Sequence, residues 1–378
     1  MKPKTMYNKR SQLSHILIIV IILSFGTELF INNINVNKEN REEFTSLTKA
    51  SDIFFNAEEE TIIQGTPVMR TTDGYNWWYY VPNSLKKFEI CYILLEQSHL
   101  QTEDYEYLTN DAQKNIIAWK SIAEEKKYIL LTVTLPRNFS HYYYPQALDK
   151  NSFDPSTPEF YYRPDLKVNN IISELIQILR NAGFFVIEKI LVAGFSAGGM
   201  WANRYTILHP ERVMAAAMGQ AGGWLTIPIF EYNETILLWP MGIANFKNLT
   251  GTEYNKQKLL KNVPQFIFIG DQDNSNTYAS EPWPTEDEIK IWGATDPERL
   301  ENQSLYLKNS GYNVKFKLYS GIGHTFTLEM KNDIIQFFDS VINISIPSYH
   351  PIILLQMIIV LSIILIIFFQ KKIKIKFR

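Results

Sequence analysis

Residues 189 to 205 read Lys-Ile-Leu-Val-Ala-Gly-Phe-Ser-Ala-Gly-Gly-Met-Trp-Ala-Asn-Arg-Tyr. The first six have the apolar, β-branched character of a buried strand, and Gly199 to His209 has helical character. Between them lies the pattern Gly-x-Ser-x-Gly, with Ser196 between Gly194 and Gly198. A strand that turns directly into a helix holds such a serine on a strained turn, and glycine on either side lets strand and helix pack closely. This context predicts that Ser196 is a nucleophile; the alternative is a glycine-rich turn with an inert serine.

The sequence around this motif alternates short β-rich runs with helical patterns from about residue 61 to residue 345. This alternation predicts one α/β domain over residues 61–345, with a mostly parallel sheet and helices on both faces. The predicted strands are Trp77–Val81, Glu89–Leu95, Tyr128–Leu135, Lys189–Gly194, Val213–Met218, Gln265–Gly270 and Val314–Tyr319. The predicted helices are Asp111–Glu125, Val168–Ala182, Gly198–His209, Glu301–Ser310 and Thr327–Val341.

Two aromatic-rich segments, near residues 141–163 and 224–262, interrupt this alternation. Long irregular segments in a compact domain are usually lids, binding loops or disordered stretches, and their aromatic content argues against disorder. We therefore expect ordered insertions. Because Tyr and Trp side chains pack more often than they bind substrate, the sequence assigns no substrate-binding residue.

A serine hydroxyl is a poor nucleophile unless a base lies beside it. Where a serine stands on such a turn, the acid and then the histidine follow it along the chain. Five of the six histidines precede the serine, end its helix or adjoin the C-terminal apolar segment: His15, His99, His141, His209 and His350. His324 remains, between a predicted strand and the last predicted helix, and is the predicted base.

The acid is expected after the strand Gln265–Gly270, where the sequence continues Asp271-Gln272-Asp273. Either aspartate could serve. We favour Asp273 because it lies further into the loop at the carboxyl edge of the sheet, where ligands bind in such sheets. Asp271 would then be a turn residue that accepts local backbone hydrogen bonds.

The negatively charged intermediate of such a reaction needs two hydrogen-bond donors. The backbone N–H of Ala197, directly after the serine, is the first candidate. The second should come from the loop after the strand Glu89–Leu95, where the sequence reads Glu96-Gln97-Ser98-His99, and Gln97 is the predicted contributor.

These residues resemble the α/β-hydrolase superfamily and, more narrowly, polyhydroxyalkanoate-depolymerase-like serine esterases. The resemblance lies in Gly-Phe-Ser-Ala-Gly-Gly at Gly194, Leu-His-Pro-Glu-Arg-Val at Leu208, Ile-Gly-Asp-Gln-Asp at Ile269 and Tyr-Ser-Gly-Ile-Gly-His at Tyr319. It covers roughly residues 65–342. It implies the α/β-hydrolase fold and ester hydrolysis without a metal or organic cofactor.

The sequence departs from this family at one place, because the family usually has His-Gly in the loop after the third strand and this chain has Gln97-Ser98. The departure motivates an alternative, a non-catalytic binding or scaffold protein on the same fold, since fold does not imply function. A membrane-anchored structural protein is a third possibility. Among enzymes, the same three residues would also suit a serine peptidase.

The chain ends suggest membrane segments. Basic residues and then an apolar run make residues 1–31 a signal peptide or an uncleaved anchor, followed by a polar linker at 32–60. Residues 351–369 are apolar enough for a transmembrane helix, and the basic tail at 370–378 favours the cytoplasmic side. We therefore expect a membrane-anchored protein whose catalytic domain is extracytoplasmic.

The composition and charge of the chain limit the classes of partner that it is expected to bind. The formal net charge is −2, without the clustered Lys and Arg that phosphate binding requires, so no nucleic-acid partner is expected. The single cysteine, Cys91, lies in an apolar run and is interpreted as a small buried residue. No Cys/His spacing predicts a metal site. The expected partners are a small-molecule or polymeric ester substrate and the lipid bilayer.

Overall fold

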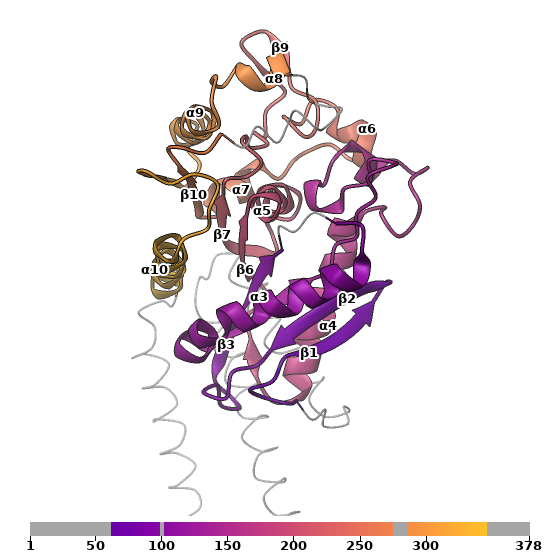
Figure 1. The fold of residues 1–378 in the computed structure, drawn as a ribbon, viewed down its shortest axis with the longest axis vertical. Coiled ribbons are helices and arrows are strands. Elements are labelled where there is room, and N and C mark those ends of the chain that lie inside the picture. Colours follow the sequence, from indigo (N-terminus) through magenta and orange to yellow (C-terminus); the bar gives the residue numbers. More distant parts are fainter. Residues whose placement is uncertain (1–61, 99–101, 275–283, 285, 346–378) are drawn as a thin grey trace, which may run out of the picture. The chain divides into compact units, whose positions relative to one another are not determined.

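The computed structural model describes residues 62–98, 102–274, 284 and 286–345 (Figure 1). The predicted signal peptide or anchor, the linker, the transmembrane helix and the basic tail lie outside these ranges. Across the ranges that are described, no helix combines the length and the apolar character needed to span a bilayer.

The chain divides into two compact units. The described part of the smaller unit contains Lys86–Glu89 and Glu174–Phe185, where the Phe88 N–H donates to the Gly183 carbonyl at 2.8 Å. The larger unit contains Ile63–Leu85, Ile90–Ser173 and the described residues from Val186 onward, and it holds every residue of the candidate site.

The sheet has the strand order β1-β2-β4-β3-β6-β7-β10-β11. Only the pairs β1–β2 and β2–β4 are antiparallel among these, so the prediction of a mostly parallel sheet is confirmed. The strands are β1 (Val68–Thr72), β2 (Tyr75–Tyr80), β3 (Ile90–Gln97), β4 (Tyr128–Val133), β6 (Ile190–Phe195), β7 (Val213–Gly219), β10 (Gln265–Gly270) and β11 (Val314–Tyr319). Three further strands have two residues each: β5 (Phe185–Val186), β8 (Glu231–Tyr232) and β9 (Thr235–Ile236).

Strand β1 was not predicted. Its residues alternate between half-buried and exposed, so it lacks the continuous apolar run that marks the central strands. It pairs with β2 through the two-residue turn Asp73-Gly74, where both residues have positive φ. Asp-Gly is a strong hairpin signal, and this dipeptide could have revealed the strand.

The helices are α3 (Tyr105–Lys126), α4 (Pro164–Asn181), α5 (Ala197–Leu208), α6 (Phe246–Thr250), α7 (Gln257–Asn262), α8 (Glu286–Lys290), α9 (Asp296–Asn309) and α10 (Leu328–Ser345). Helix α3 begins six residues before the predicted start, because the Asp104 side chain accepts a hydrogen bond from the Tyr107 N–H and caps it. Helix α9 begins five residues early, at a capping box formed by Thr295 and Glu298.

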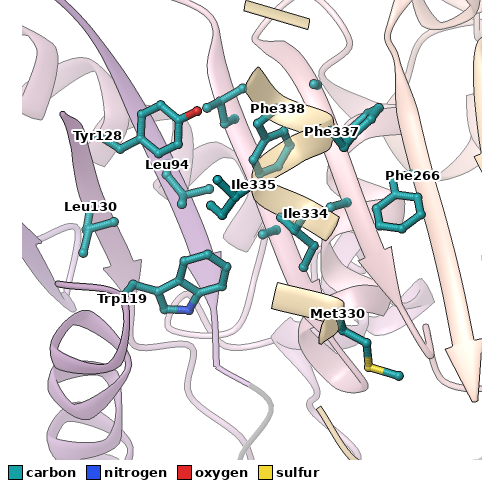
Figure 2. Close-up of a cluster of buried hydrophobic side chains, with 14 of the residues drawn as sticks. Leu94, Trp119, Tyr128, Leu130, Phe266, Met330, Ile334, Ile335, Phe337 and Phe338 are labelled. Carbon is teal, nitrogen blue, oxygen red and sulfur yellow. The ribbon is translucent and has the colours of Figure 1, made fainter. Parts of the chain in front are cut away.

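The main hydrophobic core lies between the sheet and helices α3 and α10. Trp119 of α3 and Phe338 of α10 pack with Leu94 and Leu130 of the sheet (Figure 2). Strand residues that point to the opposite face, such as Val192, are also fully buried. The sheet is therefore covered on both faces, as an apolar central strand like β6 requires.

Cys91 is fully buried in β3, and burial raises the pKa of its thiol to about 12. The interpretation of this residue as a small apolar core residue is confirmed.

The two aromatic-rich insertions are ordered within the described residues and are joined to each other. The first contains two short 3₁₀ helices, η1 (Pro145–Ala147) and η2 (Lys150–Phe153). The Trp239 indole N–H from the second donates to the Leu148 carbonyl of the first at 2.6 Å, and the Trp239 and Phe153 rings are 5.7 Å apart. The insertions thus form one packed structure at the carboxyl edge of the sheet.

Candidate active site

Ser196 occupies the turn between β6 and α5. Its φ of 55° lies in the left-handed region, and its N–H donates to the Gly219 carbonyl of β7 at 2.8 Å. A Cβ on Gly194 would lie 2.1 Å from the Gly198 carbonyl oxygen, and a Cβ on Gly198 would lie 2.2 Å from the Gln97 carbonyl oxygen. Both distances are far below van der Waals contact, so the crowding inferred from the Gly-x-Ser-x-Gly pattern is present in the structure.

The three predicted residues meet at the carboxyl edge of the sheet. His324 Nε2 lies 3.0 Å from Ser196 Oγ, and His324 Nδ1 lies 2.9 Å from Asp273 Oδ2. The tautomer that satisfies both bonds carries its proton on Nδ1 and accepts the serine hydroxyl proton at Nε2. Residues separated by 77 and 51 positions along the chain thus form one hydrogen-bonded line.

The burial of the two aspartates differs sharply. Only 1% of the Asp273 side chain is exposed, whereas Asp271 lies on the surface. A buried carboxylate bonded to the imidazole can stabilise a positive charge on it, which an exposed one would do weakly. The structure thus favours Asp273 over Asp271.

No protein-family model and no curated protein matches the sequence. In three dimensions the chain is similar to poly(aspartic acid) hydrolase-1 from Sphingomonas sp. KT-1, with 18% identity, a TM-score of 0.51, and coverage of 74% of this chain and 98% of that one. The fold is that of an α/β-hydrolase. LpqC, a poly(3-hydroxybutyrate) depolymerase from Bordetella parapertussis, aligns at 17% identity over 74% of this chain and 91% of that chain, with a TM-score of 0.49.

In this α/β-hydrolase fold, the strand register explains why distant residues converge. Phe195 pairs with Gly219 across β6 and β7, and Gly219 pairs with Phe268 across β7 and β10. Ser196 and the Asp271–Asp273 loop therefore follow strand ends at one edge of the sheet. At 18% identity the likeness to poly(aspartic acid) hydrolase-1 establishes the fold alone, and the activity has to be argued from the site.

The role of Asp271 differs from the expected one. Its Oδ1 accepts a hydrogen bond from the Gly321 N–H at 2.7 Å, which is a long-range contact and not a local turn bond. The Gln272 N–H also donates to the Ile322 carbonyl at 3.0 Å. The loop that carries the acid is therefore tied to the loop that carries the histidine, a connection that sequence spacing alone did not reveal.

Aromatic rings hold the imidazole from one side. The Phe195 ring lies 5.3 Å from the His324 ring and 5.3 Å from the Phe326 ring, measured between centroids. Because Phe195 precedes the nucleophile directly, the strand that presents Ser196 also supports its base. About a third of the His324 side chain remains exposed.

The predicted oxyanion donors have different surroundings. Ala197 is the first residue of α5, where backbone N–H groups have no partner within the helix and the dipole favours negative charge. Gln97 is the last residue of β3 and pairs with Gly194, so it belongs to the strand and not to the loop. Its side-chain amide donates to the Val133 carbonyl at 2.7 Å. That amide is thus directed to β4, and an oxyanion role for Gln97 stays a prediction.

The first insertion reaches the nucleophile. Tyr144 and Ala147 form a small buried apolar cluster with Ala197 and Met200 of α5. The Arg137 guanidinium lies 3.6 Å from the centroid of the Tyr144 ring. The first aromatic-rich segment therefore packs against Ala197, the residue that follows Ser196. The composition predicted only that this segment is ordered.

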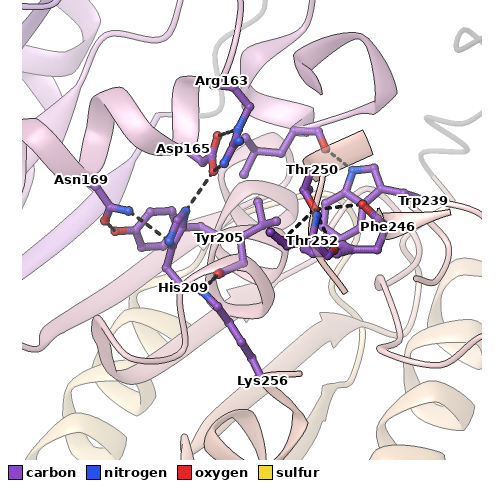
Figure 3. Close-up of polar contacts among 12 residues, drawn as sticks. Arg163, Asp165, Asn169, Tyr205, His209, Trp239, Phe246, Thr250, Thr252 and Lys256 are labelled. Atoms are coloured by element: carbon purple, nitrogen blue, oxygen red, sulfur yellow. Dashed lines mark hydrogen bonds and ion pairs between the residues drawn. The ribbon is translucent and has the colours of Figure 1, made fainter. Parts of the chain in front are cut away.

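His209 has a different environment from His324. Its Nε2 lies 3.0 Å from Asp165 Oδ2 and its Nδ1 lies 3.0 Å from the Asn169 amide nitrogen (Figure 3). Burial lowers the pKa of His209, but its contacts with Asp165 and Glu211 outweigh this and raise it. Burial alone would raise the pKa of Asp165, yet hydrogen bonds from Arg163 and His209 bring it to about 2. This pair connects α4 to the end of α5. It does not contact the hydrogen-bonded residues Ser196, His324 and Asp273, as the elimination of His209 required.

Glu96 is a buried carboxyl on β3, directly before Gln97. Burial raises its pKa to about 8, although the charge of Lys331 acts in the opposite direction. Glu96 is therefore mostly neutral at pH 7, and it places no full negative charge beside the loop expected to hold an oxyanion.

Proposed function

We propose that this chain is a serine hydrolase that cleaves carboxylic esters through an acyl-enzyme, with Ser196 as nucleophile, His324 as general base and acid, and Asp273 as the carboxylate that orients the imidazole. One observation carries the proposal: the imidazole of His324 lies within hydrogen-bonding distance of both Ser196 Oγ and Asp273 Oδ2. This arrangement is what activates an otherwise weak hydroxyl.

In the acylation step, Ser196 Oγ attacks the ester carbonyl carbon while His324 Nε2 takes the hydroxyl proton. The carbonyl oxygen becomes an oxyanion beside the Ala197 N–H at the N-terminus of α5, where developing negative charge is stabilised. The bond to the leaving alcohol then breaks, and His324 returns the proton to the alcohol oxygen. Asp273 accepts the Nδ1–H bond throughout and stays ionised.

In the deacylation step, water takes the place of the alcohol. His324 removes a proton from the water, whose oxygen attacks the acyl carbon, and then protonates Ser196 Oγ as the acid is released. The exposed third of His324 provides a route for that water.

The direct test is labelling by a fluorophosphonate, which reacts with an activated serine. Wild type should be labelled and should hydrolyse short-chain aryl esters, whereas Ser196→Ala and His324→Ala should do neither. Ser304→Ala is a matched control, since Ser304 is a buried serine of α9. Absence of labelling in folded wild type would favour the non-catalytic scaffold.

The same residues could cleave amides, so ester preference needs its own measurement. An alkoxide leaves more readily than an amine, which must be protonated as it departs, and we expect kcat/KM to be higher for esters than for matched peptide amides. A side-by-side comparison of an ester and an amide with the same acyl group tests this expectation. Faster turnover of the amide would identify a peptidase.

We also propose that the enzyme is tethered to a membrane, with the hydrolase domain extracytoplasmic and the tail at residues 370–378 cytoplasmic. Support comes from the apolar run at 351–369 and the basic residues that follow it. Extraction of intact membranes at alkaline pH should leave the chain in the membrane fraction. Protease added from outside should remove the hydrolase domain and leave a C-terminal tag protected; loss of the tag would reverse the orientation.

A further inference from the structure

We propose that Gln146 is a positioning residue that holds the start of the oxyanion loop, by donating a hydrogen bond to the carbonyl of Ser98. The inference rests on the proposed function, and it concerns how this chain supports a loop that departs from the family pattern at Gln97-Ser98.

The contact itself is buried and direct. Gln146 Nε2 donates to the Ser98 carbonyl oxygen at 3.0 Å, and the two residues are 2% and 4% exposed. Buried hydrogen bonds exclude competing water, so their loss leaves an unsatisfied polar group and displaces the chain around it.

Ser98 is also held through its side chain. Its Oγ donates to Asp111 Oδ2 of α3 at 2.6 Å. One residue earlier, the Gln97 side chain donates to the Val133 carbonyl of β4, and the Gln97 carbonyl oxygen sits against Gly198 of α5. The chain leaving β3 is thus fixed at successive residues before the loop begins.

Gln146 is itself well anchored. It lies in η1, whose neighbours Tyr144 and Ala147 pack against Ala197 and Met200. The Arg204 guanidinium of α5 donates to the Ala147 carbonyl. Gln146 therefore links α5, which presents the Ala197 N–H, to the loop from which the second donor is expected.

This linkage explains how the loop is held without glycine at position 98, where this chain has Ser98. A glycine would let the backbone approach the helix by conformational freedom, whereas here side-chain amides and a hydroxyl fix it from three directions. Gln146 acts on the reaction through Ser98 and does not need to touch the substrate.

The test uses the full-length protein with Gln146→Met, which keeps length and removes the donor. Gln303→Met is the matched control, because Gln303 is also fully buried and also donates to a backbone carbonyl, that of Leu225 at 3.0 Å. We expect Gln146→Met to lower kcat and the fluorophosphonate labelling rate by roughly 10- to 100-fold, below the cost of losing an oxyanion donor outright, with KM changed less than about threefold. Gln303→Met should lower thermal stability and leave kcat near wild type.

A second variant, Gln146→Glu, distinguishes the loss of the hydrogen bond from misfolding. In Gln146→Glu the side chain donates only when protonated, so kcat relative to wild type should rise as pH falls through the pKa of the new carboxyl. A wild-type labelling rate in Gln146→Met, equal losses in Gln303→Met, or a pH-independent ratio for Gln146→Glu would overturn the proposal. If wild type itself is not labelled, the proposed function fails first.

Discussion

The carboxylate of Asp271 accepts a hydrogen bond from the backbone N–H of Gly321 at 2.7 Å. The two residues are 50 positions apart and precede Asp273 and His324, respectively. This bond, together with the one from Gln272 to Ile322, makes the acid loop and the histidine loop a single braced unit.

Removing this brace should reduce activity although Asp271 is not part of the proposed triad. We expect Asp271→Ala to lower kcat by about 10-fold, since a displacement of about 1 Å in a catalytic group can cost up to 100-fold. Asp271→Asn keeps the accepting oxygen and should stay within about threefold of wild type. Steady-state kinetics on an aryl ester would decide, and equal losses in the two variants would contradict the backbone-accepting role.

The tautomer of His324 should depend on Asp273. Replacement by Asn offers an N–H where the imidazole needs an acceptor, and we expect Asp273→Asn to lower kcat by about 10⁴-fold, as in serine proteases that share this arrangement. Thermal stability should change little, because shape and volume are kept. A kcat within tenfold of wild type would mean that Asp273 is not the orienting acid.

The close approach of Gln97 to α5 should make position 198 intolerant of any side chain. A Cβ there would lie 2.2 Å from the Gln97 carbonyl oxygen, which is backbone and cannot move aside alone. We expect Gly198→Ala to cost about 1–3 kcal/mol of stability, the usual range for overpacking, and to abolish fluorophosphonate labelling. Gly323→Ala is the control, because its Cβ would come no closer than 3.7 Å to the Gln272 carbonyl. Urea unfolding of both variants measures the difference.

The Asp165–His209 pair should give a defined pH window of stability. The pKa of Asp165 is lowered to about 2, so its contribution is present above the ordinary aspartate pKa of about 3.9 and is lost as pH falls towards 2. The pKa of His209 is raised, so its contribution is present below about pH 6.5 and is lost as pH rises through the folded-state value. His209→Gln should therefore destabilise the protein most between about pH 4 and 6.5. The loss should be about 1.5–3 kcal/mol, the usual contribution of a hydrogen bond to a charged group. A stability difference from wild type that is flat across pH would contradict this.

Ionisation of Glu96 should destabilise the folded protein, whereas ionisation of Asp165 stabilises it. The pKa of Glu96 is raised to about 8 in the folded protein, so ionisation opposes folding increasingly as pH rises from the ordinary glutamate value of about 4.3 towards 8. The neutral isostere Glu96→Gln should stabilise the protein by a few kcal/mol, about 1.4 for each unit of pKa shift, at pH 8 and by little at pH 4. Denaturant titrations at the two pH values test this prediction. Equal stabilisation at both would contradict a raised pKa for Glu96.

Much of the site could be predicted because its signals are local. Ser196 is marked by glycines within two residues, and β6 and β10 are continuous apolar runs of the kind that marks buried parallel strands. His324 could be predicted because the other five histidines were eliminated by their positions in the sequence. The long-range bond of Asp271 could not be predicted, because an exposed aspartate in a turn has the same sequence signature whether it bonds to its neighbours or to a distant loop.

The support of the oxyanion loop was also beyond the sequence. Gln146 lies in a segment with no periodic pattern, and nothing in its neighbours indicates that its amide faces Ser98. The sequence predicts Gln97 in a loop, yet its pairing with Gly194 extends β3 through it. Tertiary contacts decided both positions.

The burial of the lone cysteine has a practical consequence. A thiol enclosed in a central strand, with its pKa near 12, offers almost no thiolate to alkylating reagents or oxidants at neutral pH. The wild-type protein should therefore tolerate reducing and oxidising buffers alike. Any cysteine introduced on its surface would be the one reactive handle, so that fluorophores or spin labels could be attached at chosen positions without first removing the native residue.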